Sequence, residues 1–132
     1  MTQMSNNVAE TAVYQQTLEQ IRNKVKFALE EAMGDSSAEI LEEMSSIFLE
    51  DVVPLIYQMN VGYANQHYIA IQMAAHALKG SSATMGLDSF ADLCQAIEGS
   101  SKLMQNSLIS RNIAALEAEY AQVKRALNAF LI

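Results

Sequence analysis

Apolar residues recur at three- and four-residue intervals along nearly the whole chain, which is the spacing of one face of an α-helix. No stretch shows the strict alternation of apolar and polar residues that is typical of a β-strand. The sequence therefore predicts an all-α protein. Its expected helical segments are 8–34 (as one helix or two short ones), 36–61, 66–84, 88–104 and 107–131.

Residues that begin or end helices stand between these segments. Gly34 and Gly86 each follow a predicted helix, as a glycine just past a helix C-terminus commonly does. Ser36, with a glutamate three residues later, fits the capping box that opens a helix. Residues 62–66 are the expected connection between the second and third helices. Pro54 falls inside the second helix and removes one backbone hydrogen bond, which predicts a kink.

One apolar face of each helix is expected to contribute to a shared core. Amphipathic helices joined by short connections pack best as an antiparallel bundle. We therefore expect an up-down four-helix bundle over residues 35–132, with an additional N-terminal helix over 8–34 lying across or beside it, and a disordered N-terminus over 1–7. In the last three helices the expected core residues are Ile71, Ala74, Leu78, Ser81 or Ser82, Met85, Phe90, Leu93, Cys94, Ile97, Leu103, Met104, Ile109, Ile113, Leu116, Tyr120, Val123, Leu127 and Phe130.

Composition narrows the class of protein. A chain of 132 residues with 51% hydrophobic residues has the size of one domain. Its net charge of −7 argues against nucleic acid as a partner. No apolar run is long enough to cross a membrane, and the N-terminus lacks the pattern of an export signal. The single cysteine, Cys94, cannot form an internal disulfide, which agrees with a cytoplasmic location.

His76 carries the most informative local pattern. At about 100° per residue, Lys79 lies roughly 60° from His76 around a helix, Gly80 roughly 40° and Ala83 roughly 20°, while Leu78 points away. Glycine inside a helix costs about 1 kcal/mol relative to alanine, so Gly80 calls for a reason, and the close approach of another protein is one. The pattern predicts an exposed imidazole beside a cation, on a surface with little side-chain bulk.

This arrangement suits phosphoryl chemistry without a catalytic centre of its own. A neutral imidazole nitrogen is a nucleophile toward phosphorus, and a neighbouring ammonium favours the charge that arrives. The chain has no phosphate-binding glycine loop, no paired acids beside His76 and no set of metal-ligating residues. His67 lies about 180° around the helix from His76 and is interpreted as a structural residue at a helix start. Cys94 is interpreted as a core residue.

The chain also resembles a known family, the histidine-containing phosphotransfer (HPt) domains that carry phosphoryl groups in multistep phosphorelays. The likeness covers about residues 36–130. The matching residues are His76, Leu78, Lys79, Gly80, Ser81 and Ser82, followed by Gly86, Leu93, Cys94 and Glu98, and preceded by the segment 48–54.

The resemblance implies roles for individual residues. His76 would be the phosphoacceptor, Lys79 would balance the charge of the phosphorylated ring, and Gly80 would let a receiver domain dock. Some members of the family have a glutamine that hydrogen-bonds the histidine; Glu98 stands at that position here, and Gln95 is the other candidate. Ser81 and Ser82 are expected to bond backbone carbonyls. The other expected docking residues are Ile69, Gln72, Met73 and Ala83.

The partners implied are receiver domains of response regulators or of hybrid histidine kinases. We expect no cofactor on this chain, with magnesium only on the receiver, and a monomer that binds neither nucleic acid nor membrane. Two alternatives stay open at this point. The bundle could bind and inhibit a kinase or receiver without carrying phosphate, or it could be part of a larger sensor kinase with the same chemistry in cis.

Overall fold

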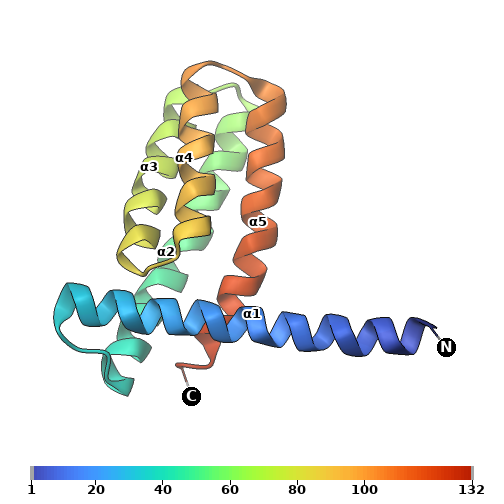
Figure 1. Ribbon diagram of the computed structural model, residues 1–132. Coiled ribbons are helices and arrows are strands. Elements are labelled where there is room, and N and C mark those ends of the chain that lie inside the picture. Colours follow the sequence, from blue (N-terminus) through green and yellow to red (C-terminus); the bar gives the residue numbers. More distant parts are fainter. Residues whose placement is uncertain (1, 132) are drawn as a thin grey trace.

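The computed structural model describes the backbone of residues 2–131 and the side chains of residues 17–131. Within this range the regular secondary structure is entirely helical. Helices α2 to α5 run alternately up and down as an antiparallel four-helix bundle, and α1 lies across one end of it (Figure 1). The predicted fold class is thereby confirmed. The helices are α1 (Thr2–Met33), α2 (Ala38–Ala64), α3 (Tyr68–Thr84), α4 (Asp88–Lys102) and α5 (Asn106–Asn128).

The core lies along the axis of the bundle, where the predicted apolar faces meet. Phe90, near the start of α4, is buried there and makes edge-to-face ring contacts with Phe48 of α2 and Tyr120 of α5, at centroid distances of 6.0 and 6.5 Å. Such contacts add to the stabilisation that burial itself provides. Leu103 and Met104 were expected in this core, but they are 69% and 65% exposed. Helix α4 ends at Lys102, so both residues lie in the turn that follows it.

The three turns within the bundle share one geometry. Gln66, Gly86 and Met104 each adopt a positive φ just after a helix. In each case the next backbone N–H donates to a carbonyl five residues earlier, at 2.7 to 2.9 Å, which is the Schellman arrangement. The expected connection at 62–66 is therefore shifted, because α2 continues through a buried Gly62 to Ala64.

Helix α1 is held against the bundle through buried Val25 and Leu29. It ends where expected: Gly34 has a φ of +70° and donates its N–H to the Glu30 carbonyl at 2.9 Å. Its backbone begins at Thr2, in the region for which the sequence predicted disorder over 1–7, and neither glycine nor proline interrupts the chain before Gly34. The division of the chain into 1–7, 8–34 and 35–132 stays a prediction.

The start of α2 lies one residue later than expected. Ser37, not Ser36, is the N-cap, and its hydroxyl accepts a hydrogen bond from the Ile40 N–H at 3.4 Å. Pro54 lies inside α2, as the sequence indicates. Helix α3 presents its outer face to solvent between α2 and α4 (Figure 1).

Candidate functional site

His76 lies near the middle of α3 on the face that points away from the core. Its side chain is 69% exposed, whereas Ala75 and Leu78 of the same helix are fully buried. The helical spacing predicted this difference, because residues two positions apart point in nearly opposite directions. The imidazole is therefore accessible to a molecule as large as another protein.

The carboxylate of Glu98 joins His76 to Lys79. Glu98 belongs to the neighbouring helix α4, and its Oε2 lies 3.1 Å from His76 Nδ1. Lys79 Nζ donates a hydrogen bond to the other oxygen, Oε1, at 2.9 Å. The sequence left Glu98 and Gln95 open as the contact of His76; the residue that makes the contact is Glu98, and Gln95 is exposed on α4.

The charge of Glu98 determines which nitrogen of His76 holds the proton. The hydrogen bond from Lys79 is the main cause that lowers the pKa of the Glu98 carboxyl below its ordinary value. The positive charge of Lys79 and the hydrogen bond to His76 lower this pKa further, whereas partial burial of the carboxyl raises it. An ionised carboxylate only accepts hydrogen bonds. His76 Nδ1 must therefore be the donor, and the neutral ring keeps its lone pair on Nε2.

Lys102 is a further member of this cluster that the sequence analysis did not identify. Its Nζ lies 3.8 Å from Glu98 Oε2. The four-residue spacing between Glu98 and Lys102 on one helix is a signal that could have revealed the pair. One carboxylate, only 14% exposed, thus contacts an imidazole and two ammonium groups.

The surface on the other side of His76, toward α2, is apolar. Met73 is 68% exposed and lines a groove of about 290 Å³ between α2 and α3, together with Tyr57 and Val61 of α2. Tyr57 and Val61 were not singled out from the sequence, although both fall outside the core positions of α2. His76 therefore stands between an apolar flank on α2 and a charged flank on α4.

The remaining expected docking residues also lie at the surface of α3. Ile69 is 66% exposed and Ala83 is exposed, whereas Gln72 is half-buried. At Gly80, an added Cβ would meet no other atom of the chain within 4 Å. The absence of a side chain at Gly80 is therefore not required by packing within the protein.

Neighbouring polar groups of α3 are satisfied within the helix. Ser81 and Ser82 donate hydrogen bonds to the carbonyls of Ala77 and Leu78, as expected. His67 is the N-cap residue of α3, in agreement with its interpretation as a residue at a helix start. These hydroxyls take no part in the contact between His76 and Glu98.

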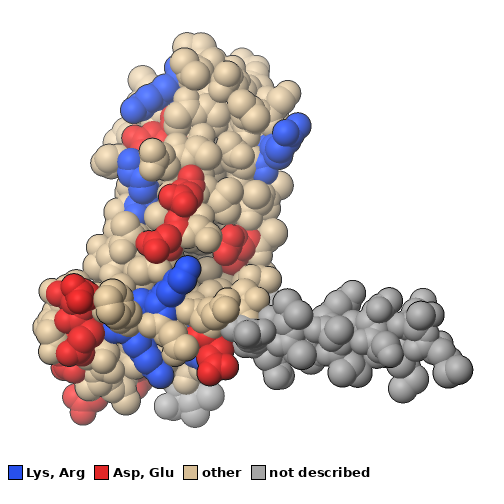
Figure 2. Space-filling view, in the orientation of Figure 1, with Lys and Arg blue, Asp and Glu red and all other residues tan. Residues whose placement is uncertain are grey.

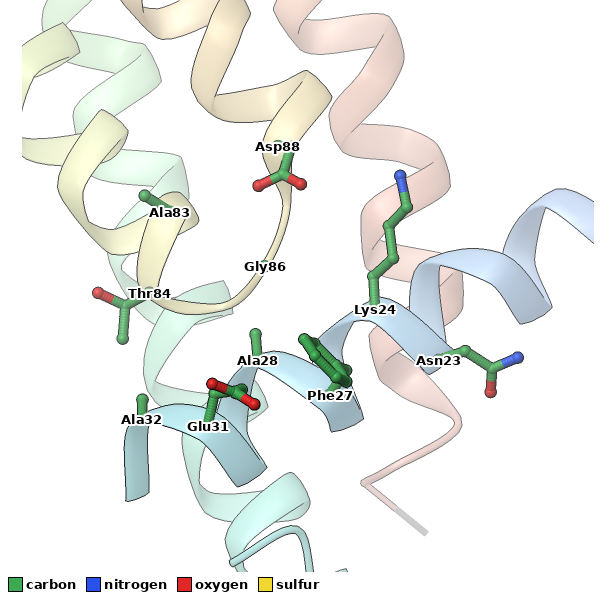
Figure 3. A pocket seen from close by; sticks show the side chains of 10 residues that line it. All are labelled: Asn23, Lys24, Phe27, Ala28, Glu31, Ala32, Ala83, Thr84, Gly86 and Asp88. Atoms are coloured by element: carbon green, nitrogen blue, oxygen red, sulfur yellow. The ribbon is translucent and has the colours of Figure 1, made fainter. Parts of the chain in front are cut away.

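A second hollow lies at the end of the bundle, apart from the cluster around Glu98. It is a groove of about 680 Å³ between α1 and the turn that joins α3 to α4. Figure 3 shows Phe27 and Ala28 of α1 on one side and Ala83 and Gly86 on the other. Its lining contains neither histidine nor cysteine.

Charge is distributed unevenly over the surface. Acidic side chains gather where α1 ends and α2 begins, at the lower left of Figure 2. The exposed acidic residues near this junction are Glu30, Glu31, Asp35, Glu39, Glu42 and Glu43.

In the described part of the chain, no group of three or more His, Cys, Asp or Glu side chains is arranged to hold a metal ion. No helix within the described residues is long and apolar enough to cross a membrane.

Fold and site together define an all-α bundle that presents an exposed histidine, in contact with a carboxylate, on its surface. The chain belongs to the Hpt domain family, whose sequence model matches residues 43–126. That range contains His76, Lys79 and Glu98. The chain is also similar to the sensor protein TorS of Escherichia coli K12, with 32% identity over 82 residues; this segment covers 61% of the chain and 9% of TorS. No solved structure matched the chain.

Membership in this family supports a general role. Hpt domains are phosphocarriers of two-component phosphorelays, and they interact with receiver or kinase partners. Family membership thus supports a phosphocarrier role for the segment 43–126. The chain spans about a tenth of the length of TorS.

Proposed function

We propose that His76 accepts a phosphoryl group from the aspartyl phosphate of one receiver domain and passes it to the aspartate of another. The observation that supports this most directly is the contact between the ionised Glu98 carboxylate and His76 Nδ1. It leaves Nε2 of an exposed ring as the nucleophile. Receiver domains of response regulators or hybrid kinases are the proposed partners, in the cytoplasm.

The transfer consumes no reactant other than the two proteins. The lone pair of His76 Nε2 attacks the phosphorus of the aspartyl phosphate, a P–N bond forms and the P–O bond to the aspartate breaks. The aspartate leaves as a carboxylate. The ring gains positive charge while Nδ1 keeps its proton, and the carboxylate of Glu98 stabilises that charge. Transfer to the second receiver reverses these steps.

Two neighbours of His76 support the transfer. Lys79 lies one helical turn away, so its ammonium can balance the charge of the phosphoryl group. Gly80 leaves open space where the surface of a receiver must approach closely. The chain itself would need no cofactor; we expect the receiver to supply magnesium and the acidic residues that hold it.

The docking surface proposed for the receiver is centred on His76. It includes the expected residues Ile69, Gln72, Met73 and Ala83, and the apolar groove adds Tyr57 and Val61 of α2. Transient complexes of this kind bury modest areas. We propose that the carrier acts as a monomer, because helices α2 to α5 of one chain already form a full bundle.

The proposal is tested by incubating the chain with a receiver domain whose aspartate carries radioactive phosphate. We expect a label on the chain that is labile in acid and stable in base, and that disappears in the variant His76→Gln. The matched control is His67→Gln, which removes the other histidine of the chain; because His67 lines the apolar groove, this variant should at most slow the labelling and should not abolish the label. Binding of the receiver without any label would instead support the inhibitory module.

A further inference from the structure

Lys102 approaches the same carboxylate as His76 and Lys79, although it comes from a different helix than they do. Lys79, on α3, bonds Oε1 of Glu98 at 2.9 Å, and Lys102, on α4, lies 3.8 Å from Oε2. In the described part of the chain, the charged or titratable side chains that contact Glu98 are His76 and Lys79 from α3 and Lys102 from its own helix. Each oxygen of the carboxylate thus has a cation near it.

The two lysines differ in what else they can reach. Lys79 follows His76 by three residues, so both side chains lie on one stripe of α3. Lys102 follows Glu98 by four residues on α4, which makes Glu98 its closest neighbour along that helix. A phosphoryl group on His76 adds close to two negative charges. That group would compete with Glu98 for Lys79, which shares the helical stripe of His76, whereas Lys102 is anchored on α4 beside Glu98.

We propose that Lys102 is a positioning residue that keeps Glu98 ionised when Lys79 turns from Glu98 to the phosphoryl group on His76. This inference rests on the proposed function. Without a second ammonium, Glu98 would face the new negative charge with only the phosphorylated ring of His76 as its counter-ion, and protonation of its carboxyl would become easier. A protonated Glu98 would no longer hold the proton on His76 Nδ1, and the phosphorylated ring would lose its orientation.

The test follows the titration of the Glu98 carboxyl carbon by NMR in unphosphorylated protein. Four chains are compared: the natural sequence, Lys79→Gln, Lys102→Gln and the double variant. Lys79→Gln reproduces the withdrawal of Lys79 from Glu98. In the natural sequence we expect Lys102→Gln to raise the titration midpoint of Glu98 by about 0.3. In the Lys79→Gln background the same substitution should raise it at least twice as much, because Lys102 is then the remaining ammonium at the carboxylate.

Equal shifts in the two backgrounds would overturn the proposal. So would a shift no larger than that caused by Lys124→Gln, which makes the same charge change at an exposed position of α5. The side chain of Lys79 is half-buried, at 32% exposed, and that of Lys102 is exposed, at 61%; neither belongs to the core, so the variants should keep the fold, which circular dichroism checks. The titration involves neither phosphate nor receiver. A negative titration result would therefore contradict the role of Lys102 alone. The proposed function is contradicted by a different result, the absence of label on His76.

Discussion

The backbone of Gly86 lies directly against the backbone of Lys24. A Cβ added at Gly86 would stand 2.7 Å from the Lys24 carbonyl oxygen and 2.6 Å from the Cβ of Ala28. Gly86 also has a φ of +73°, a conformation that side-chain-bearing residues rarely adopt. Two separate requirements thus act on one residue: the turn after α3 needs the positive φ, and the packing of α1 across the bundle needs the missing side chain.

A comparison of two glycine substitutions should separate these requirements. Gly34 has nearly the same φ, +70°, but an added Cβ there would meet nothing within 4 Å. We expect Gly34→Ala to destabilise the protein by about 1 kcal/mol through backbone strain alone. Gly86→Ala should cost about 3 kcal/mol or more, because α1 must also move. Urea unfolding of both variants measures this, and equal losses would contradict the role of close packing.

Gly80 should behave in the opposite way. Because it is inside α3 with open space around it, we expect Gly80→Gln to raise the free energy of unfolding by about 0.5 kcal/mol through helix propensity. The same variant should lose most of its phosphotransfer from a receiver domain. It should still accept phosphate from phosphoramidate, a donor small enough to need no docking surface. Normal transfer from the receiver would show that Gly80 is not a point of close approach.

Glu98 should make the stability of the protein depend on pH. Its pKa is lowered in the folded state, mainly by the hydrogen bond from Lys79. The ionised carboxylate therefore stabilises the fold at pH values above the unfolded-state pKa, and this contribution is lost as the pH falls through the folded-state pKa. We expect Glu98→Gln to destabilise the protein by about 1 kcal/mol near neutral pH.

The difference between Glu98→Gln and the natural sequence should shrink as the pH falls through the folded-state pKa of Glu98, and it should disappear once the carboxyl is protonated in both the folded and the unfolded chain. Thermal unfolding at several pH values measures it. The matched control is Glu42→Gln, at an exposed position of α2. If the difference stays constant with pH, the ion pair with Lys79 does not contribute to stability.

The sequence predicted the faces of the helices better than their ends. The exposure of His76 and the burial of Leu78 follow from helical spacing alone, because position along one helix determines direction. The connection that contains Gln66 was predicted but began too early, at Gly62, and the turn at Met104 was not predicted, since a positive φ leaves a clear signal only where glycine provides it. Gly62, which the sequence assigned to a connection, instead lies inside α2. An added Cβ there would stand only 2.8 Å from the side chain of Ile71 on α3.

The sequence predicted which residues of the third helix lie near His76, but not the contacts that this helix makes with its neighbours. Lys79 and Gly80 share a helix with His76, so their proximity could be read from spacing. The sharing of one carboxylate depends on how α4 packs beside α3, and spacing within one helix says nothing about that register. The sequence accordingly left Glu98 and Gln95 as alternatives. Tyr57 and Val61 were missed for the same reason, because they reach the His76 face only through the packing of α2 against α3.

Cys94 offers a chemical measure of how often the bundle opens. It is fully buried in α4, and burial raises the pKa of its thiol to about 12. Since the thiolate is the reactive form, we expect thiol reagents at about pH 8 to modify Cys94 only when the core unfolds. The labelling rate should therefore rise with urea in parallel with the unfolded fraction. The control is Ser110→Cys in a Cys94→Ala chain, which moves the thiol to an exposed position of α5 and should react at once without denaturant. Rapid labelling of Cys94 in the native protein would mean that α4 separates from the bundle far more readily than its packing implies.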